Sequence, residues 1–563
     1  MASNISGGEA VAAALKSFKI RNVFGVASGK LSPLLKAISD RPELDYMGVR
    51  HEASAAFMAT AIAARHGEPA VCLGETGAGG LNLLSGLGGA FANSLPVIAI
   101  TSNNSSHLID PDAGVFSSSR NRALFEAVTK WSCDVRAGER IPELMREAFR
   151  RATTGRPGPV HIDIPADILA NTMEAPAGEL EAPRWHYAVP SSVGPRFHEL
   201  EAAADVLLRA ERPLIIAGGG AIAASEKIVA LSNMTGWPVV TTQMGLGIMP
   251  SDHENLVGQG GIIGGPAVQK ALLEADGLLV VGCRFSSWMW PDGRRGWTHP
   301  DRQSVVQVDI DPPVIGRYAP VDHGFVCDSS AFLSSIIAWV GELAIPDRRK
   351  WAQELREVRD RHRAALRALS DERTTPIHPA ALANAVGSAI GGAGLVIFDG
   401  GHTTFWSNDF TPVPGPRTRF HEPGMTHLGF GLPWALAMKR AEPDLPVWCI
   451  TGDGAFGFTI QELDTARREG LDVLIVVHNN EALGVIQQGQ EKAGFSLGTS
   501  LAGTDYAAVA RGFGCFGEVV TTLDEIPGAI ARARASGLPA VLDVRVKFVP
   551  HPMLPAFARS SQG

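Results

Sequence analysis

The chain has 563 residues, a length that predicts three or four domains because one hydrophobic core rarely extends beyond about 250–300 residues. Hydrophobic residues make up 45% of the chain, which is enough for several buried sheets. The net charge is -8, with 50 Lys and Arg against 58 Asp and Glu, and no basic tract or Arg-rich helix occurs. This charge pattern gives no support to nucleic acid or an anionic membrane as a partner.

The cysteines and the N-terminus indicate a compartment. The six cysteines are scattered without a CxxC pair, and several lie in strand-like runs, as expected of small buried hydrophobic residues in a reducing compartment. Residues 1–19 lack a basic segment followed by an apolar run, and no apolar stretch reaches about 18 residues. We therefore expect a cytoplasmic protein.

Three blocks of alternating strand and helix patterns follow one another along the chain. Blocks one and three have similar sizes and the same alternation, so two related α/β halves are expected to flank a middle domain. The predicted fold class is α/β, with three doubly wound parallel-sheet domains. The predicted parts are residues 1–175, a linker over 174–195, residues 190–345, a charged helix over 347–370, residues 372–550 and a C-terminal tail over 551–563.

Two short motifs in the third block, GDG at 452–454 and Asn479-Asn480, close consecutive strands. Residues 445–450 and 471–477 read as buried strands, and residues 458–468 between them read as an amphipathic helix. A right-handed βαβ crossover makes such strands parallel, so Asp453 and Asn480 are expected at the carboxyl edge of the sheet, where ligands bind.

These residues fit a Mg²⁺ ion that carries a diphosphate. Mg²⁺ prefers oxygen ligands and commonly combines few protein groups with phosphate oxygens, which Asp453, the Asn480 amide oxygen and one backbone carbonyl leave room for. Gly452 and Gly454 let the backbone approach the phosphates, and the next helix offers N–H groups to them. Taken singly, each motif is more often an ordinary turn.

With these motifs in hand, the chain resembles the thiamine diphosphate (ThDP) enzyme superfamily, specifically the acetolactate synthase, pyruvate oxidase and benzaldehyde lyase group. The resemblance covers nearly the whole chain, and its motifs occur in family order. They are RHEASAAFMA at 50–59, GAGGLNLLSGLGGAFANSLPVIAITS at 77–102, GRPGPVHIDIPADIL at 155–169, LGFGLPWALA at 428–437 and GDGAFGFTIQELDTARREGLDVLIVVHNN at 452–480.

The resemblance implies three domains in the order pyrimidine-binding, central and diphosphate-binding. It also implies a homodimer or homotetramer, because ThDP lies between the first domain of one subunit and the third domain of another. Glu52 is implied as the catalytic carboxylate that hydrogen-bonds the aminopyrimidine ring of ThDP and promotes proton removal from its thiazolium. Without the family match, such a glutamate reads as a solvated cap or an ion-pair partner.

The remaining cofactor and metal positions are likewise implied by the resemblance. Leu428 would hold ThDP bent, although plain core packing competes with that role, and His402 would face the diphosphate unless it is a surface turn residue. Asp453, Asn480 and the Ala482 carbonyl would bind Mg²⁺. The cofactor-binding set is Thr76, Asn82, Gly401, His402, Thr403, Gly424, Thr426, Leu428, Gly452, Gly454, Ala455, Leu483 and Gly484.

Substrate contacts are expected from five positions. Lys30 aligns with a catalytic-site histidine of benzaldehyde lyase and is predicted either to bind a carboxylate or other anionic group, or to be a solvated loop lysine. Phe116 and Ser117 stand where acetolactate synthases carry Phe-Gln, so the role of that glutamine is in doubt. Val485 and Gln488, just past the metal segment, are expected to face the pocket.

Two departures from the sequence patterns of the family narrow the range of expected activities. Residues 284–288 read RFSSW where acetolactate synthases have RFDDR, which disfavours acetolactate synthesis and FAD in the central domain while leaving FAD open. The first domain offers no His-His pair over 103–107, which disfavours a simple pyruvate decarboxylase.

We therefore expect a ThDP- and Mg²⁺-dependent carbon-carbon lyase or carboligase that acts on 2-oxo acids or 2-hydroxy ketones. The choice among decarboxylase, lyase and carboligase stays open. The alternatives are a flavin-linked oxidoreductase of the pyruvate oxidase type and a non-catalytic nucleotide-binding relative.

Overall fold

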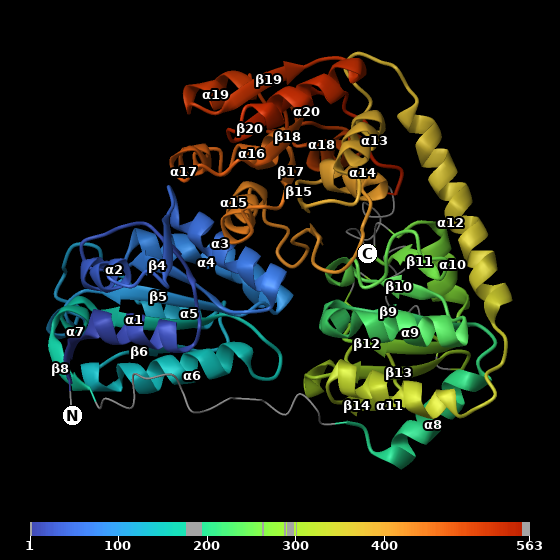
Figure 1. Ribbon diagram of the computed structural model, residues 1–563, viewed down its shortest axis with the longest axis horizontal. Coiled ribbons are helices and arrows are strands. Elements are labelled where there is room, and N and C mark those ends of the chain that lie inside the picture. The colour runs from blue at the N-terminus through green and yellow to red at the C-terminus, as the bar shows by residue number, and fades with distance from the viewer. Residues whose placement is uncertain are drawn as a thin grey trace.

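The protein consists of three six-stranded sheets, each built from parallel strands and flanked by helices (Figure 1). The predicted fold class is therefore confirmed. Among the described helices, none is long and apolar enough to cross a membrane. The structure is a computed structural model, and it describes residues 3–175, 194–261, 264–286, 289, 298–299 and 301–553.

The first sheet has the strand order β3-β2-β4-β5-β7-β6. Its central strands are apolar runs that are buried on both faces, as parallel sheets covered by helices require. The strands are β2 (Asn22–Gly25), β3 (Asp45–Gly48), β4 (Ala70–Glu75), β5 (Val97–Asn103), β6 (Ser132–Asp134) and β7 (Val160–Pro165). The helices are α1 (Gly7–Ser17), α2 (Ser32–Ser39), α3 (Glu52–His66), α4 (Ala78–Asn93), α5 (Asn121–Glu126), α6 (Ile141–Thr153) and α7 (Ala166–Ala170).

A two-stranded antiparallel ribbon joins the ends of this domain. It pairs β1 (Ser3–Ser6) with β8 (Thr172–Ala175). Glu174, which the sequence placed in a linker, therefore belongs to a strand, because its backbone pairs with Asn4. Residues 176–193 of the predicted linker lie outside the described residues.

The second sheet has the order β11-β10-β9-β12-β13-β14, so the chain reverses direction across the sheet between β9 and β12. In open α/β sheets, the crevice at such a reversal is where ligands bind. The strands are β9 (Pro213–Ala217), β10 (Val239–Thr241), β11 (Leu256–Gln259), β12 (Gly277–Val281), β13 (Ser304–Asp309) and β14 (His323–Val326). The helices are α8 (Phe197–Arg209), α9 (Ser225–Thr235), α10 (Pro266–Glu274) and α11 (Ser329–Gly341).

The third sheet, β16-β15-β17-β18-β20-β19, has the same order as the first when strands are counted along the chain: second, first, third, fourth, sixth, fifth. The outer domains thus share one topology, and α12 (Arg349–Ser370) provides the charged helix predicted before the third. The strands are β15 (Leu395–Asp399), β16 (Arg419–Phe420), β17 (Val447–Gly452), β18 (Leu474–Asn479), β19 (Phe516–Val520) and β20 (Ala540–Arg545). The helices are α13 (Pro379–Ile390), α14 (His402–Phe410), α15 (Gly431–Ala441), α16 (Asp453–Phe456), α17 (Glu462–Arg468), α18 (Gly484–Lys492), α19 (Tyr506–Gly512) and α20 (Ile526–Ala535).

The first and third domains of one chain pack directly on each other, with α3 against α15 (Figure 1). One hydrophobic cluster runs through both domains and includes Phe57, Leu87 and Trp434. At the border of this cluster, Arg65 Nη2 donates to Glu442 Oε2 at 2.8 Å. The helices that carry site residues are therefore held by a continuous core.

Candidate active site

The predicted metal ligands lie at the carboxyl edge of the third sheet. Asp453 follows β17 and is 3% exposed, while Asn480 follows the neighbouring parallel strand β18. The helix expected over 458–468 begins only at Glu462, because the short helix α16 and a turn take up the preceding residues. The predicted placement of the two side chains at one edge does not depend on that difference.

Asp453 has one oxygen that the protein leaves unsatisfied. Its Oδ1 accepts a hydrogen bond from Gly454 N at 2.8 Å, whereas its buried Oδ2 has no partner among the described residues. Burial raises the pKa of the Asp453 carboxyl to about 6, against the opposing effect of nearby backbone N–H groups. Because an unpaired buried carboxylate is costly, this oxygen fits a bound cation. The amide oxygen of Asn480 accepts from Ala482 N at 3.2 Å, which fixes the second proposed ligand.

Three loops at this edge approach each other closely, and a Cβ on either of two glycines would meet a side chain of the neighbouring loop. A Cβ on Gly401 would overlap Val485 Cγ2, and one on Gly454 would lie 2.5 Å from Leu483 Cδ2. The predicted cofactor residues of segments 400–403, 452–455 and 482–485 therefore converge. Backbone packed this tightly at the start of helices α14 and α16 suits the approach of phosphate oxygens.

His402 lies at the start of α14 and is 8% exposed, so its reading as a surface turn residue is wrong. The backbone N–H of His551 donates to His402 Nδ1 at 3.2 Å. Burial lowers the pKa of His402 to about 4, so the ring is neutral near pH 7 and carries its proton on Nε2. Nε2 is buried without a partner among the described residues, and its N–H fits an anionic group such as a diphosphate.

Asp399, at the end of β15, is a functional residue that sequence reasoning missed. Its carboxylate is 1% exposed and accepts backbone N–H groups from Gly429 at 3.1 Å and Gly431 at 3.0 Å. It thus anchors the segment that carries Leu428, and a Cβ on Gly429 would lie 3.3 Å from the Ala455 carbonyl oxygen. An acidic residue directly before two glycines at a strand end could have indicated this anchor.

We expect Asp399→Asn to change how the free energy of unfolding depends on pH. Burial raises the pKa of Asp399 to about 7. Because the folded pKa exceeds the unfolded one, the contribution of this carboxyl to stability is complete below about pH 4 and lost by about pH 7, on the order of 1 kcal/mol per pH unit. Urea unfolding of both proteins at several pH values tests this. A stability difference that stays constant between those limits would contradict it.

The first domain places Glu52, the predicted catalytic residue, at the start of α3. Asn82 Nδ2 donates to Glu52 Oε2 at 2.9 Å, and a Cβ on Gly79 would lie 3.1 Å from Glu52 Oε1. Two predicted residues of this domain, Glu52 and Asn82, are therefore in direct contact.

Thr76 belongs to a buried polar network just beside this pair. Ser119 Oγ lies 3.1 Å from Thr76 Oγ1 and accepts from Gly77 N at 2.9 Å. Ser119 in turn donates to Asn121 Oδ1 at 2.5 Å, and Asn121 Nδ2 donates to the buried Asp163 Oδ1 at 2.8 Å. This network attaches the segment after β5 to the turn that begins α4.

Among the described residues, no hydrogen bond joins Glu52 to the third-domain segments 400–403, 452–455 and 482–485 of the same chain. The loop that carries Thr426 and Leu428 instead meets the C-terminal half of α4: Met425 lies beside Gly88, and Asn93 lies beside Gly424. Gly79 beside Glu52 and the positions at 88–93 are about 14–21 Å apart along the helix, at 1.5 Å per residue.

The candidate substrate residues fall into two groups. Lys30 Nζ forms an ion pair with Glu75 Oε1 at 2.9 Å. Ser117 has a φ of 56° and its Oγ lies beside Gly77, while the neighbouring Phe116 side chain is 91% exposed. In the third domain, Val485 packs on Gly401, and Gln488 is half-buried on α18.

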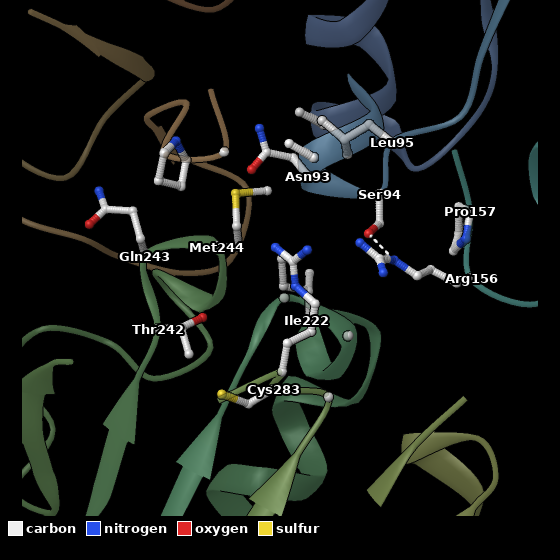
Figure 2. A pocket seen from close by; sticks show the side chains of 18 of the residues that line it. Asn93, Ser94, Leu95, Arg156, Pro157, Ile222, Thr242, Gln243, Met244 and Cys283 are labelled. Atoms are coloured by element: carbon white, nitrogen blue, oxygen red, sulfur yellow. Dashed lines mark hydrogen bonds between the residues drawn. The ribbon is translucent and has the colours of Figure 1, made fainter. Parts of the chain in front are cut away.

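A separate cavity of about 700 Å³ lies where the three domains meet (Figure 2). Its lining includes Gly219, Gly220 and Gly282, which follow β9 and β12 at the chain reversal of the second sheet. Figure 2 shows Gln243 and Met244 of the second domain and Asn93 of the first among the residues that line this cavity. Buried Gln243 Nε2, Asn93 Oδ1 and Trp434 Nε1, all from lining residues, have no partner among the described residues.

This cavity has the size and polarity of a small-molecule site. Arg284 and Ser286 of the RFSSW segment line it, whereas Ser287 and Trp288 lie outside the described residues. The prediction that the RFSSW segment disfavours FAD in the central domain therefore stays a prediction.

Comparison with known proteins identifies the family. The N-terminal, central and C-terminal domain models of thiamine pyrophosphate enzymes match residues 5–124, 200–336 and 399–544. A probable acetolactate synthase large subunit of Methanocaldococcus jannaschii is 33% identical over 96% of this chain and 92% of its own length. An acetolactate synthase large subunit of Mycobacterium tuberculosis is 31% identical over 96% and 88%, and the isozyme 2 large subunit of Escherichia coli is 30% identical over 99% of both chains. The chain therefore belongs to the thiamine diphosphate-dependent enzymes, in the group of the acetolactate synthase large subunits.

Proposed function

We propose that the chain is a ThDP- and Mg²⁺-dependent carboligase that makes or breaks a carbon-carbon bond next to a carbonyl group of a 2-oxo acid or 2-hydroxy ketone. One observation carries this proposal: unpaired Asp453 Oδ2, unpaired His402 Nε2 and the close-packed glycines occupy one edge of the third sheet. There, Asp453, Asn480 and the Ala482 carbonyl would hold Mg²⁺, and His402 would donate to the diphosphate.

The protein groups have separate tasks. Bound ThDP supplies the electron sink that allows a bond beside a carbonyl to break and form. Glu52 would hold and release a proton at Oε1 towards the aminopyrimidine ring, while Asn82 holds its Oε2. Leu428 gives the cofactor an apolar contact, and Asp399 holds the segment that carries Leu428. Gly424 and Thr426 supply backbone groups from the same loop.

Two chains are proposed to complete each site, in a homodimer or homotetramer. The support is the arrangement within one chain. Glu52 lies beside the first turn of α4, whereas the loop that carries Leu428 meets the opposite end of the same helix. The large side chains Met425, Phe458, Ile486 and Leu497 near the third-domain site are more than half exposed, and a second subunit would cover them. Light scattering of the purified protein measures this assembly.

Lys30, Phe116, Ser117, Val485 and Gln488 are proposed to line the substrate side of the composite site. The RFSSW segment predicts that the protein purifies without flavin, and its visible absorbance tests this. A bound flavin together with reduction of an electron acceptor would instead support oxidase chemistry. A cytoplasmic location is proposed from the cysteine pattern.

The activity is tested with protein loaded with ThDP and Mg²⁺ and a panel of 2-oxo acids and acyloins. Carboligation predicts CO₂ release from a 2-oxo acid together with a new acyloin or acetohydroxy acid. Aldehyde release from acyloins without CO₂ would indicate lyase chemistry. No turnover of any of these compounds by the loaded, correctly folded protein would overturn the proposed function.

A further inference from the structure

The Lys30–Glu75 ion pair is the feature of the first domain that family membership leaves unexplained. Lys30 follows β2, and Glu75 is the last residue of the neighbouring strand β4. Lys30 Nζ lies 2.9 Å from Glu75 Oε1, and Lys30 N donates to Glu75 Oε2 at 3.4 Å. The two side chains are 21% and 22% exposed, so part of each remains accessible.

The pair lies on the same sheet edge as the cofactor groups of the first domain. Glu75 directly precedes Thr76 and Gly77, which the Ser119 network holds, and Gly79 two positions later contacts Glu52. Ligands of parallel α/β sheets bind at this carboxyl edge. The pair therefore lies at the same sheet edge as Glu52 and Thr76 of the proposed site.

The electrostatics of the pair differ from those of a free lysine. Burial opposes ionisation of Glu75, but hydrogen bonds from Lys30 and its neighbours keep the pKa of Glu75 below its usual value. The two charges cancel, so the pair attracts an anion far less than Lys30 alone would. An ammonium has three donors, of which Glu75 takes one, and the carboxylate retains acceptor capacity.

We propose that Lys30 and Glu75 form the acceptor subsite and select a hydroxy aldehyde over a second 2-oxo acid, an inference that rests on the proposed function. A hydroxyl group both donates and accepts, so it can bond to Glu75 and Lys30 together. A substrate carboxylate only accepts and would have to lie beside the Glu75 carboxylate, which is repulsive.

The reaction at this subsite balances without an oxidant or reductant. The donor 2-oxo acid loses CO₂, and its acyl carbon forms a bond to the carbonyl carbon of the acceptor. The acceptor carbonyl oxygen takes up one proton and becomes a hydroxyl group. With a hydroxy aldehyde as acceptor, the product is a dihydroxy ketone.

Two variants with opposite charge changes test the subsite. With a saturating donor from the activity panel, kcat/KM is measured for glycolaldehyde and for 2-oxobutyrate as acceptors. The wild-type protein is expected to favour glycolaldehyde. Glu75→Gln leaves a net positive subsite and should shift the ratio toward 2-oxobutyrate by roughly tenfold or more, while Lys30→Gln should shift it away from 2-oxobutyrate.

The control is Asp40→Asn, which breaks an exposed ion pair between Lys36 on α2 and Asp40 just after the helix and should leave the ratio unchanged. If the ion pair is purely structural, Glu75→Gln and Lys30→Gln should each lower kcat/KM equally for the two acceptors. That result, or a wild-type preference for 2-oxobutyrate, would overturn the inference while the donor still turns over. Failure of every donor in the panel would overturn the proposed function and the inference with it.

Discussion

Replacing Glu52 with glutamine is expected to lower kcat by about 100- to 10,000-fold, the range for loss of a positioned acid-base group. Glutamine keeps the size of the side chain and can still bond to Asn82, but it cannot exchange a proton through Oε1. The fold should persist, because the change removes a charge without opening a cavity. Steady-state kinetics of the loaded enzyme measure kcat, and circular dichroism and thermal unfolding report the fold.

Glu68→Gln provides the matched control for Glu52→Gln. Glu68 is an exposed glutamate just beyond the end of the same helix, α3, and lies outside the proposed site. It should retain wild-type turnover and ThDP binding. If Glu52→Gln binds ThDP and remains as active as this control, then Glu52 is not the proton-exchanging group and the assignment of the site fails.

The site residues that the sequence could predict are those fixed by local geometry. Asp453 and Asn480 each follow a buried strand of one βαβ unit, and the handedness of that unit alone requires both at the same edge. The three-domain fold follows from the same alternation of elements. The shared strand order of the outer sheets is indicated in the sequence only by the similar sizes and the same alternation of the two blocks, because topology is preserved while side chains change.

The sequence could not supply pairings between residues that are distant along the chain. Glu75 follows Lys30 by 45 positions in the chain. The two residues become partners only because β2 and β4 are neighbours in the sheet. His402 acquires its donor tautomer from the backbone of His551, 149 positions later. The helix after Asp453 was predicted to begin too early, because periodicity does not reveal where a glycine-rich turn yields to a helix.

Replacing Asp453 with alanine is expected to abolish stabilisation by ThDP with Mg²⁺. A ligand that binds only the folded state adds about 2.7 kcal/mol to the free energy of unfolding at 100 times its Kd. The variant lacks the carboxylate proposed to bind Mg²⁺, so its melting temperature should not rise when both ligands are added. Differential scanning calorimetry with ThDP alone, with Mg²⁺ alone and with both ligands measures the change.

In the ligand-free protein, the same substitution should raise the free energy of unfolding or leave it unchanged. Asp453 Oδ2 is buried without a partner among the described residues, so its loss removes a desolvated carboxyl group, and this gain offsets the loss of the hydrogen bond from Gly454. Asp444→Ala, at an exposed position before β17, should retain the full ligand response. An Asp453→Ala protein that is strongly destabilised without ligands yet still stabilised by ThDP and Mg²⁺ would show that the carboxylate is structural. Loss of the ligand response without destabilisation of the ligand-free protein is what distinguishes a metal ligand from a structural aspartate.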